Sequence, residues 1–338
     1  MNPIKNASLK KYNTFGFDVQ CSHLIEIHNE TDLLELYAED FFDNHFRVIG
    51  GGSNILLTRN YSGGILLNRL MGHWMESEDE HSIDITFGAG ENWHQTVLHC
   101  VKNNWGGLEN LSLIPGCVGA SPIQNIGAYG IEVKDKIVSV RVFDTTSGEF
   151  VILSNEDCRF GYRDSIFKRA EYKHLIVTSV TFHLSKINHE LKLNYGDIQH
   201  ELKQQNVSQP TIADVSNAVI AIRRSKLPDP AVLGNSGSFF KNPVVEMDIF
   251  KAAQLKYPEI KWFPVDETHV KVAAGWLIET AGWKGFKKGN VGVHEKQALV
   301  LVHFGGGKGE EISSLAREIQ TDIHDKFGIV LEFEVNIW

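Results

Sequence analysis

Ser238 is the first candidate for chemistry in this sequence, because its hydroxyl lies in a short glycine-rich motif. It follows a Gly-Ser-Gly turn within residues 234–243 (GNSGSFFKNP) and precedes two phenylalanines, so it could be held rigidly beside an apolar wall. Such a serine could act as a nucleophile or a proton donor, although the G-x-S-x-G motif of hydrolase nucleophiles is missing. A hydrogen bond to the local backbone, in a turn or a helix cap, is the commoner role.

Arg163 and two C-terminal glutamates are further candidates. Arg163 lies among aromatic residues in 160–168 (FGYRDSIFK), where a guanidinium could bind a carboxylate or phosphate through two parallel hydrogen bonds. An ion pair with Asp164 or another nearby acid is at least as common. Glu332 and Glu334 share the polar face of a predicted strand, and such a face is ordinarily solvated. The two-residue periodicity of the strand does not distinguish one glutamate from the other.

The stretch 112–130 (SLIPGCVGASPIQNIGAYG) is almost uncharged and rich in glycine, proline and small polar residues. That composition suits a backbone that turns tightly and approaches a ligand closely. Gln124 and Asn125 add amide donors and acceptors, and Tyr129 adds a flat amphipathic ring. The stretch could wrap a large, flat cofactor, and an ordinary surface loop explains its composition equally well.

A second glycine-rich turn follows residues 46–49. The sequence FRVIGGG predicts a short buried strand that runs into the turn, with Ser53 and Asn54 after it. Successive N–H groups in such a turn can bind a phosphate, although a simple turn between strands is slightly favoured. Neither a G-x-G-x-x-G fingerprint nor a P-loop is present, because the lysine of 305–309 (GGGKG) is not followed by Ser or Thr.

The length of 338 residues predicts two or three domains. A net charge of −9 argues against nucleic-acid binding. The sequence has neither an N-terminal apolar signal region nor an apolar run of membrane-spanning length, which predicts a cytoplasmic protein without membrane insertion. The four cysteines form no C-x-x-C pair and the fifteen histidines are dispersed, so we expect reduced thiols and no metal site.

Hydrophobic periodicity predicts the elements that position these residues. Strands are expected at 82–88, at 138–142 and 150–153 as a hairpin, at 176–184, and as a period-two strand over 329–338. Helices are expected at 93–101, 212–224, 247–257 and 273–280, and the strongest amphipathic helix over 312–327. Because most strands of the first half follow one another directly, the fold class is α+β and not a doubly wound parallel sheet.

Seven motifs in order resemble the UDP-N-acetylenolpyruvoylglucosamine reductases, also called UDP-N-acetylmuramate dehydrogenases, of bacterial peptidoglycan synthesis. They are IGGGSNILL, IPGCVGASPIQNIGAYG, CRFGYRDSIFK, KLPDP, GNSGSFFKNP, AAGWLIE and LEFEV. The resemblance as a whole runs from about Tyr12 to Val335, nearly the whole chain. Residues 195–198 (YGDI) are similar to the long type of the family, which has an extra loop carrying a tyrosine.

The resemblance implies an FAD-binding domain of the vanillyl-alcohol-oxidase (PCMH) type and a separate α+β substrate domain. The expected parts are subdomains 1–70 and 71–215, with strand 328–338 joining the first, and a substrate domain 216–327. The residues implied to hold FAD are Gly50, Gly51, Gly52, Ser53, Asn54, Pro115, Gly116, Gly119, Ser121, Gln124, Asn125, Gly127, Tyr129 and Arg223.

The family reaction passes a hydride from NADPH through FAD to the enolpyruvyl ether of UDP-N-acetylglucosamine. The resemblance implies that Arg163 and Glu334 stabilise the developing charge and that Ser238 protonates C2. It assigns Tyr195, Lys226 and Asn242 to the UDP-sugar, with Lys226 compensating phosphate charge. A monomer is expected.

Two positions depart from the family pattern. Phe263 stands where long-type relatives often have a tyrosine, and Asn336 stands where many have an arginine. Two other functions are alternatives: a flavin oxidase that acts on an alcohol, and a flavoprotein or nucleotide-sugar binder without catalysis. The motif around Ser238 argues against the oxidase, and the presence of all three catalytic candidates argues against the binder.

Overall fold

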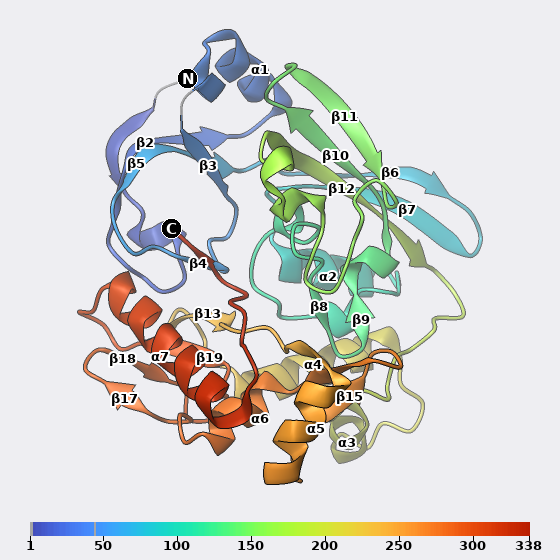
Figure 1. Cartoon of the computed structure of the whole chain (residues 1–338). Helices are drawn as coiled ribbons and strands as arrows, with labels where there is room; N and C mark the ends of the chain where they lie inside the picture. The colour runs from blue at the N-terminus through green and yellow to red at the C-terminus, as the bar shows by residue number, and fades with distance from the viewer. Residues whose placement is uncertain (1–2, 44) are drawn as a thin grey trace. The chain divides into compact units, whose positions relative to one another are not determined.

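The computed structural model describes residues 3–43 and 45–338, which form two compact units (Figure 1). The first unit contains Cys21–Gly51, Ser62–Ser225 and the N-terminal stretch to Ala7. The second contains Ser8–Gln20, Gly52–Tyr61 and Lys226–Trp338. In the described ranges, no helix is long and apolar enough to cross a membrane.

A four-stranded sheet begins the first unit. Its order is β1 (Ile4–Ser8), β2 (Gln20–Ile27), β5 (Tyr61–Asn68) and β3 (Phe46–Ile49), with β3 parallel to β5. Helix α1 (Glu30–Ala38) begins at a capping box between Asn29 and Asp32. Its buried Leu33 and Leu36 share a hydrophobic cluster with residues of β2 and β5.

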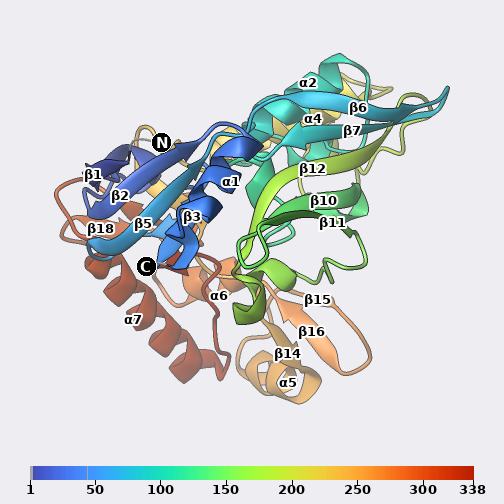
Figure 2. The ribbon, with the colours of Figure 1, turned by 90° about the horizontal axis from the view of Figure 1, so that it is seen from above.

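A five-stranded antiparallel sheet forms the larger part of this unit. Its order is β11 (Glu149–Ser154), β10 (Ile137–Asp144), β12 (Leu175–Ser185), β7 (Ser82–Gly88) and β6 (His73–Glu78). Figure 2 shows β12 between β10 and β7. Helix α2 (Trp93–Lys102) packs with β7 and β12 in one core cluster. The predicted strand 82–88 and the β10–β11 hairpin are confirmed.

Smaller elements complete the first unit. The short strands β8 (Gly127–Ala128) and β9 (Ile131–Glu132) pair at the end of the glycine-rich stretch. Helices α3 (Ile198–Gln204) and α4 (Ile212–Lys226) pack through a cluster of their own, with Tyr129 against it.

The second unit contains three sheets and three α-helices. One sheet has the order β13 (Gly234–Ser238), β19 (Val300–His303), β18 (Val291–Val293) and β17 (Lys287–Lys288). The others are β14 (Val244–Glu246), β16 (His269–Val272) and β15 (Trp262–Pro264), and a parallel pair of β20 (Asn336–Ile337) with β4 (Ile55–Leu56). The helices are α5 (Met247–Lys256), α6 (Ala274–Thr280) and α7 (Gly309–Phe327).

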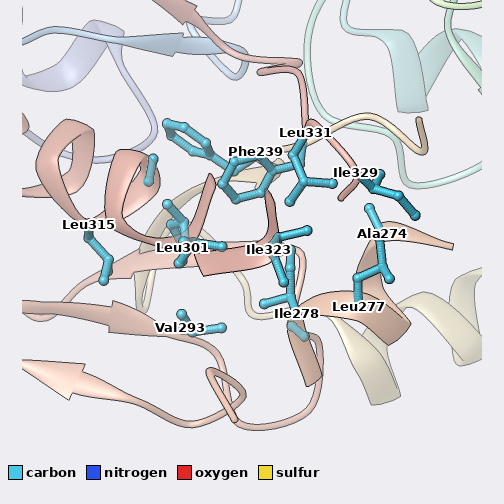
Figure 3. Close-up of a cluster of buried hydrophobic side chains, with 14 of the residues drawn as sticks. Phe239, Ala274, Leu277, Ile278, Val293, Leu301, Leu315, Ile323, Ile329 and Leu331 are labelled. Carbon is cyan, nitrogen blue, oxygen red and sulfur yellow. The ribbon is translucent and has the colours of Figure 1, made fainter. Parts of the chain in front are cut away.

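One hydrophobic core holds the second unit together, and Figure 3 shows part of it. Leu315 and Ile323 of α7 belong to this core together with Leu301 of β19, so the predicted amphipathic helix is confirmed. Phe15 and Phe17, from the early part of the chain, belong to the same cluster. The fold class is therefore α+β, as predicted.

The expected C-terminal strand is wrong as a continuous element. Burial alternates from Ile329 to Glu332 as period two requires, whereas Phe333 and Glu334 are both half-buried. Only Asn336–Ile337 forms a strand, with an isolated bridge from Phe333 to Phe240. An extended segment can bury alternate side chains while partners for its backbone occur at only a few positions. Periodicity reports burial, and strand pairing also needs a continuous neighbouring edge.

Candidate active site

The stretch 112–130 of the first unit is fixed by the start of helix α2. Trp93 donates its backbone N–H to Gly116 O at 3.0 Å, and its indole Nε1 to Leu111 O at 2.9 Å. Leu113 donates its N–H to His94 Nδ1 at 3.0 Å. Side chains and backbone of one helical turn therefore determine the course of the loop.

Two glycines explain how close the chain segments come at this loop. A Cβ on Gly51 would lie 2.9 Å from Cα of Gly116, so the two predicted cofactor stretches touch within the first unit. Gly52 has φ +62°, and a Cβ there would overlap the carbonyl of Tyr12 in the second unit. The immediate need for these glycines is close contact between backbone segments.

The predicted FAD residues of the first unit differ in exposure. Gly51 and Pro115 are exposed; Gly50, Gly116, Gln124, Gly127, Tyr129 and Arg223 are half-buried; Gly119, Ser121 and Asn125 are buried. In the described part of the chain, the buried Ser121 Oγ has no hydrogen-bond partner. A buried hydroxyl without a partner is costly, so a polar group of a bound molecule would satisfy it.

Asn125 supports the loop from inside. Its Nδ2 donates to Glu132 Oε2 at 3.0 Å and to Gly161 O at 2.9 Å, and its Oδ1 accepts from Lys134 N at 3.1 Å. These bonds use both amide hydrogens and the carbonyl oxygen. The side chain of Asn125 therefore organises the loop, and its backbone carbonyl accepts a separate hydrogen bond from Arg163.

Arg163 is joined to the same loop. Its Nη1 donates to Asn125 O at 3.3 Å and its Nη2 to Gly127 O at 2.6 Å. The residue has φ +53°, a left-handed conformation that is uncommon outside glycine. Lys168 Nζ donates to the carbonyl of Arg163 at 3.1 Å. The structure thus holds this positive charge, at some conformational cost, beside the end of the glycine-rich loop.

Arg223 binds the opposite end of the loop, where its Nε donates to Leu113 O at 3.2 Å. Burial lowers the pKa of its guanidinium; Tyr129 acts on this pKa in the opposite direction, and Arg163 in the same direction. The two arginines and Tyr129 are therefore electrostatic neighbours. A concentration of positive charge beside a glycine-rich loop suits an anionic ligand.

Ser238 and Glu334 are brought together within the second unit. Ser238, half-buried at the end of β13, is followed by Phe239 and Phe240, both fully buried. Glu334 donates its backbone N–H to Phe239 O at 2.8 Å, across a long sequence separation. Glu332 is different, because its side chain is 71% exposed and pairs with Lys241 at 3.0 Å. The structure thus distinguishes the two glutamates that the sequence pattern leaves equivalent.

The predicted Ser53–Asn54 turn meets the same C-terminal segment. Asn54 Nδ2 donates to Glu334 O at 3.2 Å. Asn336 donates both its backbone N–H and its side-chain Nδ2 to Asn54 O, each at 3.1 Å. Asn336, one of the two departures from the family pattern, therefore stabilises this turn through neutral hydrogen bonds.

The predicted substrate residues lie in separate segments of the chain. Tyr195 is 48% exposed in the first unit, and a Cβ on Gly130 would lie 3.3 Å from its Cβ. In the second unit, Asn242 Oδ1 accepts from Ala274 N at 3.0 Å, and Lys226 is exposed. Phe263 on β15 is 43% exposed, and its neighbour Trp262 is 40% exposed.

His94 is a residue that the sequence reasoning missed. Burial lowers the pKa of its imidazole, and Arg224 and Arg223 lower it further. Its Nδ1 accepts the Leu113 N–H, so the neutral ring supports the loop. No local signal separates it from the other fourteen histidines, because its role depends on a partner nineteen residues away.

Comparisons with known proteins match this arrangement. A family model for an FAD binding domain matches residues 23–154, and one for the C-terminal domain of UDP-N-acetylenolpyruvoylglucosamine reductase matches residues 229–338. The solved structure of UDP-N-acetylenolpyruvylglucosamine reductase from Thermus caldophilus has the same fold, with a TM-score of 0.68 at 23% identity. The match covers 100% of this chain and 99% of that one.

Sequence similarity to curated relatives identifies the family. The UDP-N-acetylenolpyruvoylglucosamine reductase of Flavobacterium johnsoniae is 48% identical over 332 residues, which cover 98% of each chain. The enzyme of that name from Chromobacterium violaceum is 49% identical over 331 residues, which cover 97% of each chain. Such identity over nearly the whole of both chains confirms the resemblance seen in the motifs. This chain belongs to the UDP-N-acetylenolpyruvoylglucosamine reductase family.

Proposed function

We propose that this protein reduces the enolpyruvyl ether of UDP-N-acetylglucosamine to UDP-N-acetylmuramate in peptidoglycan synthesis, with bound FAD and with NADPH as the reductant. Family membership supports the reaction class, and the match to an FAD binding domain supports the cofactor. The structural observation that supports the chemistry is the backbone contact beside Ser238, through which Glu334 reaches the same part of the second unit.

The two glycine-rich stretches fit an FAD cradle. The approach of Gly51 to Gly116 joins them, Ser121 Oγ is buried without a partner among the described residues, and Arg223 adds positive charge. We assign the cofactor to residues 50–54 and 115–129 with Arg223. When bound, FAD supplies hydride transfer from NADPH to C3 of the enolpyruvyl group.

Side chains of this protein stabilise the charge that develops during the reaction and supply the proton that completes it. Hydride addition at C3 leaves negative charge at C2 that extends into the adjacent carboxylate. The guanidinium of Arg163 and the side chain of Glu334 stabilise this charge. Ser238 Oγ–H gives its proton to C2, a step for which a positioned acid typically contributes about 10²- to 10⁴-fold.

Binding of the UDP-sugar is assigned to Tyr195, Lys226 and Asn242. Lys226 offsets diphosphate charge, and Asn242 uses its Nδ2 hydrogens because its Oδ1 already accepts from Ala274. Phe263 supplies an apolar ring without a hydroxyl donor. We further propose a cytoplasmic monomer made of two FAD subdomains, 1–70 and 71–215, and a substrate domain, 216–327, with 328–338 returning to the first subdomain.

The visible spectrum of oxygen-free protein tests the overall function. The flavin band should bleach with NADPH and return on addition of UDP-N-acetylglucosamine enolpyruvate. A band that bleaches without recovering would leave a flavoprotein with another acceptor. A colourless protein that cannot be reconstituted with FAD would refute the proposal.

Stopped-flow kinetics of Ser238→Ala test the proton donor. Flavin reduction by NADPH should stay within about 2-fold of the parent rate, while oxidation by the enolpyruvyl sugar should slow by about 10²-fold or more. Ser236→Ala, which removes a buried hydroxyl two residues away, is the matched control and should affect neither half-reaction. Equal loss in both half-reactions of Ser238→Ala would contradict the assignment.

A further inference from the structure

Strand β13 contains an irregularity just before Ser238. Asn235 lies opposite Val302 of β19 and Ser238 opposite Val300, so two residues of β13 oppose Leu301 alone. This is a β-bulge, which inserts one extra residue and changes the face to which the following side chain belongs. Gly237 has φ +71° within it.

The bulge decides which face of the sheet carries Ser238. Val300 and Val302 share one face, whereas Leu301 lies between them and points into the hydrophobic core. In a regular ladder, the side chain three residues after Asn235 would lie on the face of Leu301. The extra residue places Ser238 on the face of Val300, away from that core.

The side chain of Asn235 holds the bulge. Its Oδ1 accepts the N–H of Gly237 at 3.0 Å. Its Nδ2 donates to Leu233 O at 2.8 Å and to Pro228 O at 3.2 Å. Asn235 is 2% exposed, and these three bonds use both amide hydrogens and the carbonyl oxygen. One buried amide thus ties the bulge to the segment that precedes the strand.

We propose that Asn235 is a positioning residue for Ser238: its three hydrogen bonds fix the bulge that presents the serine hydroxyl to the substrate. The inference rests on the proposed role of Ser238 as proton donor. Asn235 itself transfers no proton. Because a displacement of about 1 Å can cost 10²-fold in rate, loss of the bulge slows protonation without removing the donor.

Two variants test this in the FAD-loaded protein. Asn235→Ala removes all three bonds, and Asn235→Asp keeps an acceptor for the Gly237 N–H but places a carboxylate against two carbonyl oxygens. In both, oxidation of the reduced flavin by UDP-N-acetylglucosamine enolpyruvate should slow by at least about 10-fold, while reduction by NADPH stays within about 2-fold. Flavin content and thermal unfolding report whether each variant is folded.

A double variant separates positioning from a general loss of structure. If Asn235 acts through Ser238, then Asn235→Ala added to Ser238→Ala should slow oxidation no further. A residue that merely stabilises the unit would lower the rate by the same factor in either background. Independent, multiplicative losses would therefore overturn the inference.

Gly237 provides a second route if the Asn235 variants fail to fold. The space around it is open, so a new side chain meets only the restriction on positive φ. Gly237→Asn tolerates that conformation and should keep both half-reactions within about 3-fold, whereas Gly237→Val should slow oxidation selectively by about 10-fold.

The outcomes distinguish the inference from the function on which it rests. Native oxidation rates in the folded Asn235 variants, with Ser238→Ala slow, would overturn the inference and leave the proton donor intact. A native oxidation rate in Ser238→Ala would refute the donor itself. If the Asn235 variants do not fold, equal rates in Gly237→Val and Gly237→Asn would overturn the inference.

Discussion

Leu113 illustrates how single side chains shape the cofactor loop. Its backbone is left-handed, with φ +59°, and both of its polar backbone atoms are bonded to side chains. The N–H donates to His94 Nδ1 and the carbonyl accepts from Arg223 Nε. Because Nδ1 must be unprotonated to accept, the arrangement requires a neutral His94.

The pKa of His94 makes the stability of the fold depend on acid pH. Burial, with Arg224 and Arg223, lowers this pKa in the folded state below the usual value of about 6.5. Well above pH 6.5 the ring is neutral in both states. As the pH falls below 6.5, the unfolded chain binds a proton that the folded chain refuses, so stability decreases down to the folded pKa.

His94→Asn should weaken that dependence, since its Oδ1 can replace Nδ1 as an acceptor and does not titrate. Urea unfolding at pH 5 to 8 should show a smaller acid-side loss for this variant than for the parent protein. His94→Leu should be less stable than His94→Asn at pH 8, because leucine leaves the Leu113 N–H without its acceptor. Identical pH profiles for the parent and His94→Asn would show that His94 is not the titrating group.

The cysteines give a prediction about reactivity. All four are buried, and burial raises the pKa of both Cys100 and Cys158 to about 12. Burial also raises the pKa of Cys21 and Cys117. The thiolate is the reactive form, so a thiol reagent at pH 8 should label the folded chain more than about 10²-fold more slowly than the unfolded chain. Rapid labelling of folded protein at Cys117 would contradict the burial of this thiol.

At the scale of elements, helix α7 should carry much of the stability of the second unit. Leu315 is fully buried on its apolar face, so Leu315→Ala should cost about 2–5 kcal/mol of unfolding free energy. Arg317, exposed on the same helix, is the control, and Arg317→Ala should change stability by less than about 0.5 kcal/mol. Urea unfolding measures both, and equal losses would argue against this orientation of α7.

The same helix shows what the sequence can predict. Leu315, Ile319 and Ile323 are spaced on one helical face, and Gly328 ends the helix with φ +68°, so local pattern and capping agree. The C-terminal segment shows the opposite case. Its alternation predicts burial correctly for Ile329 to Glu332. Its backbone partners come from residues near 54 and 240, and local pattern contains no information about them.

The candidate site also contains features that the sequence predicts and features that it does not. Motifs locate Ser238, Arg163 and both glycine-rich stretches, because these depend on residue type and order. The sequence gives no means to find Asn235 as the support of a bulge, since the bulge is defined by the register with Val300 and Val302. The glycines are a mixed case: composition indicates backbone freedom, whereas only the fold shows that Gly51 needs it to approach Gly116.

At the scale of the whole molecule, the second unit is discontinuous in sequence. The C-terminal family model covers residues 229–338, but the core of this unit also contains Phe15, Phe17 and Leu56. Strand β20 pairs with β4, from residues 55 and 56. The C-terminal part of the chain therefore lacks part of its own core and a strand partner.

A fragment of residues 226–338 should consequently fail to fold alone. Without the early segments it loses three large buried side chains, each worth about 1.5–3 kcal/mol, which is a substantial fraction of typical domain stability. We expect no cooperative urea transition in near-ultraviolet circular dichroism. Adding a peptide of residues 8–20 should not restore it, because 52–61 is still missing. A cooperative transition in the isolated fragment would contradict this interpretation.

The discontinuity of the second unit also sets an order of events on the ribosome. Residues 8–20 and 52–61 are synthesised first, yet the core that buries Phe15, Phe17 and Leu56 is completed only after Lys226 and the residues beyond it emerge. At roughly 5–20 residues per second, the stretch from Tyr61 to Lys226 takes on the order of ten to thirty seconds. During that interval these apolar side chains lack their final partners, and the growing chain is open to the chaperones that bind exposed phenylalanine and leucine.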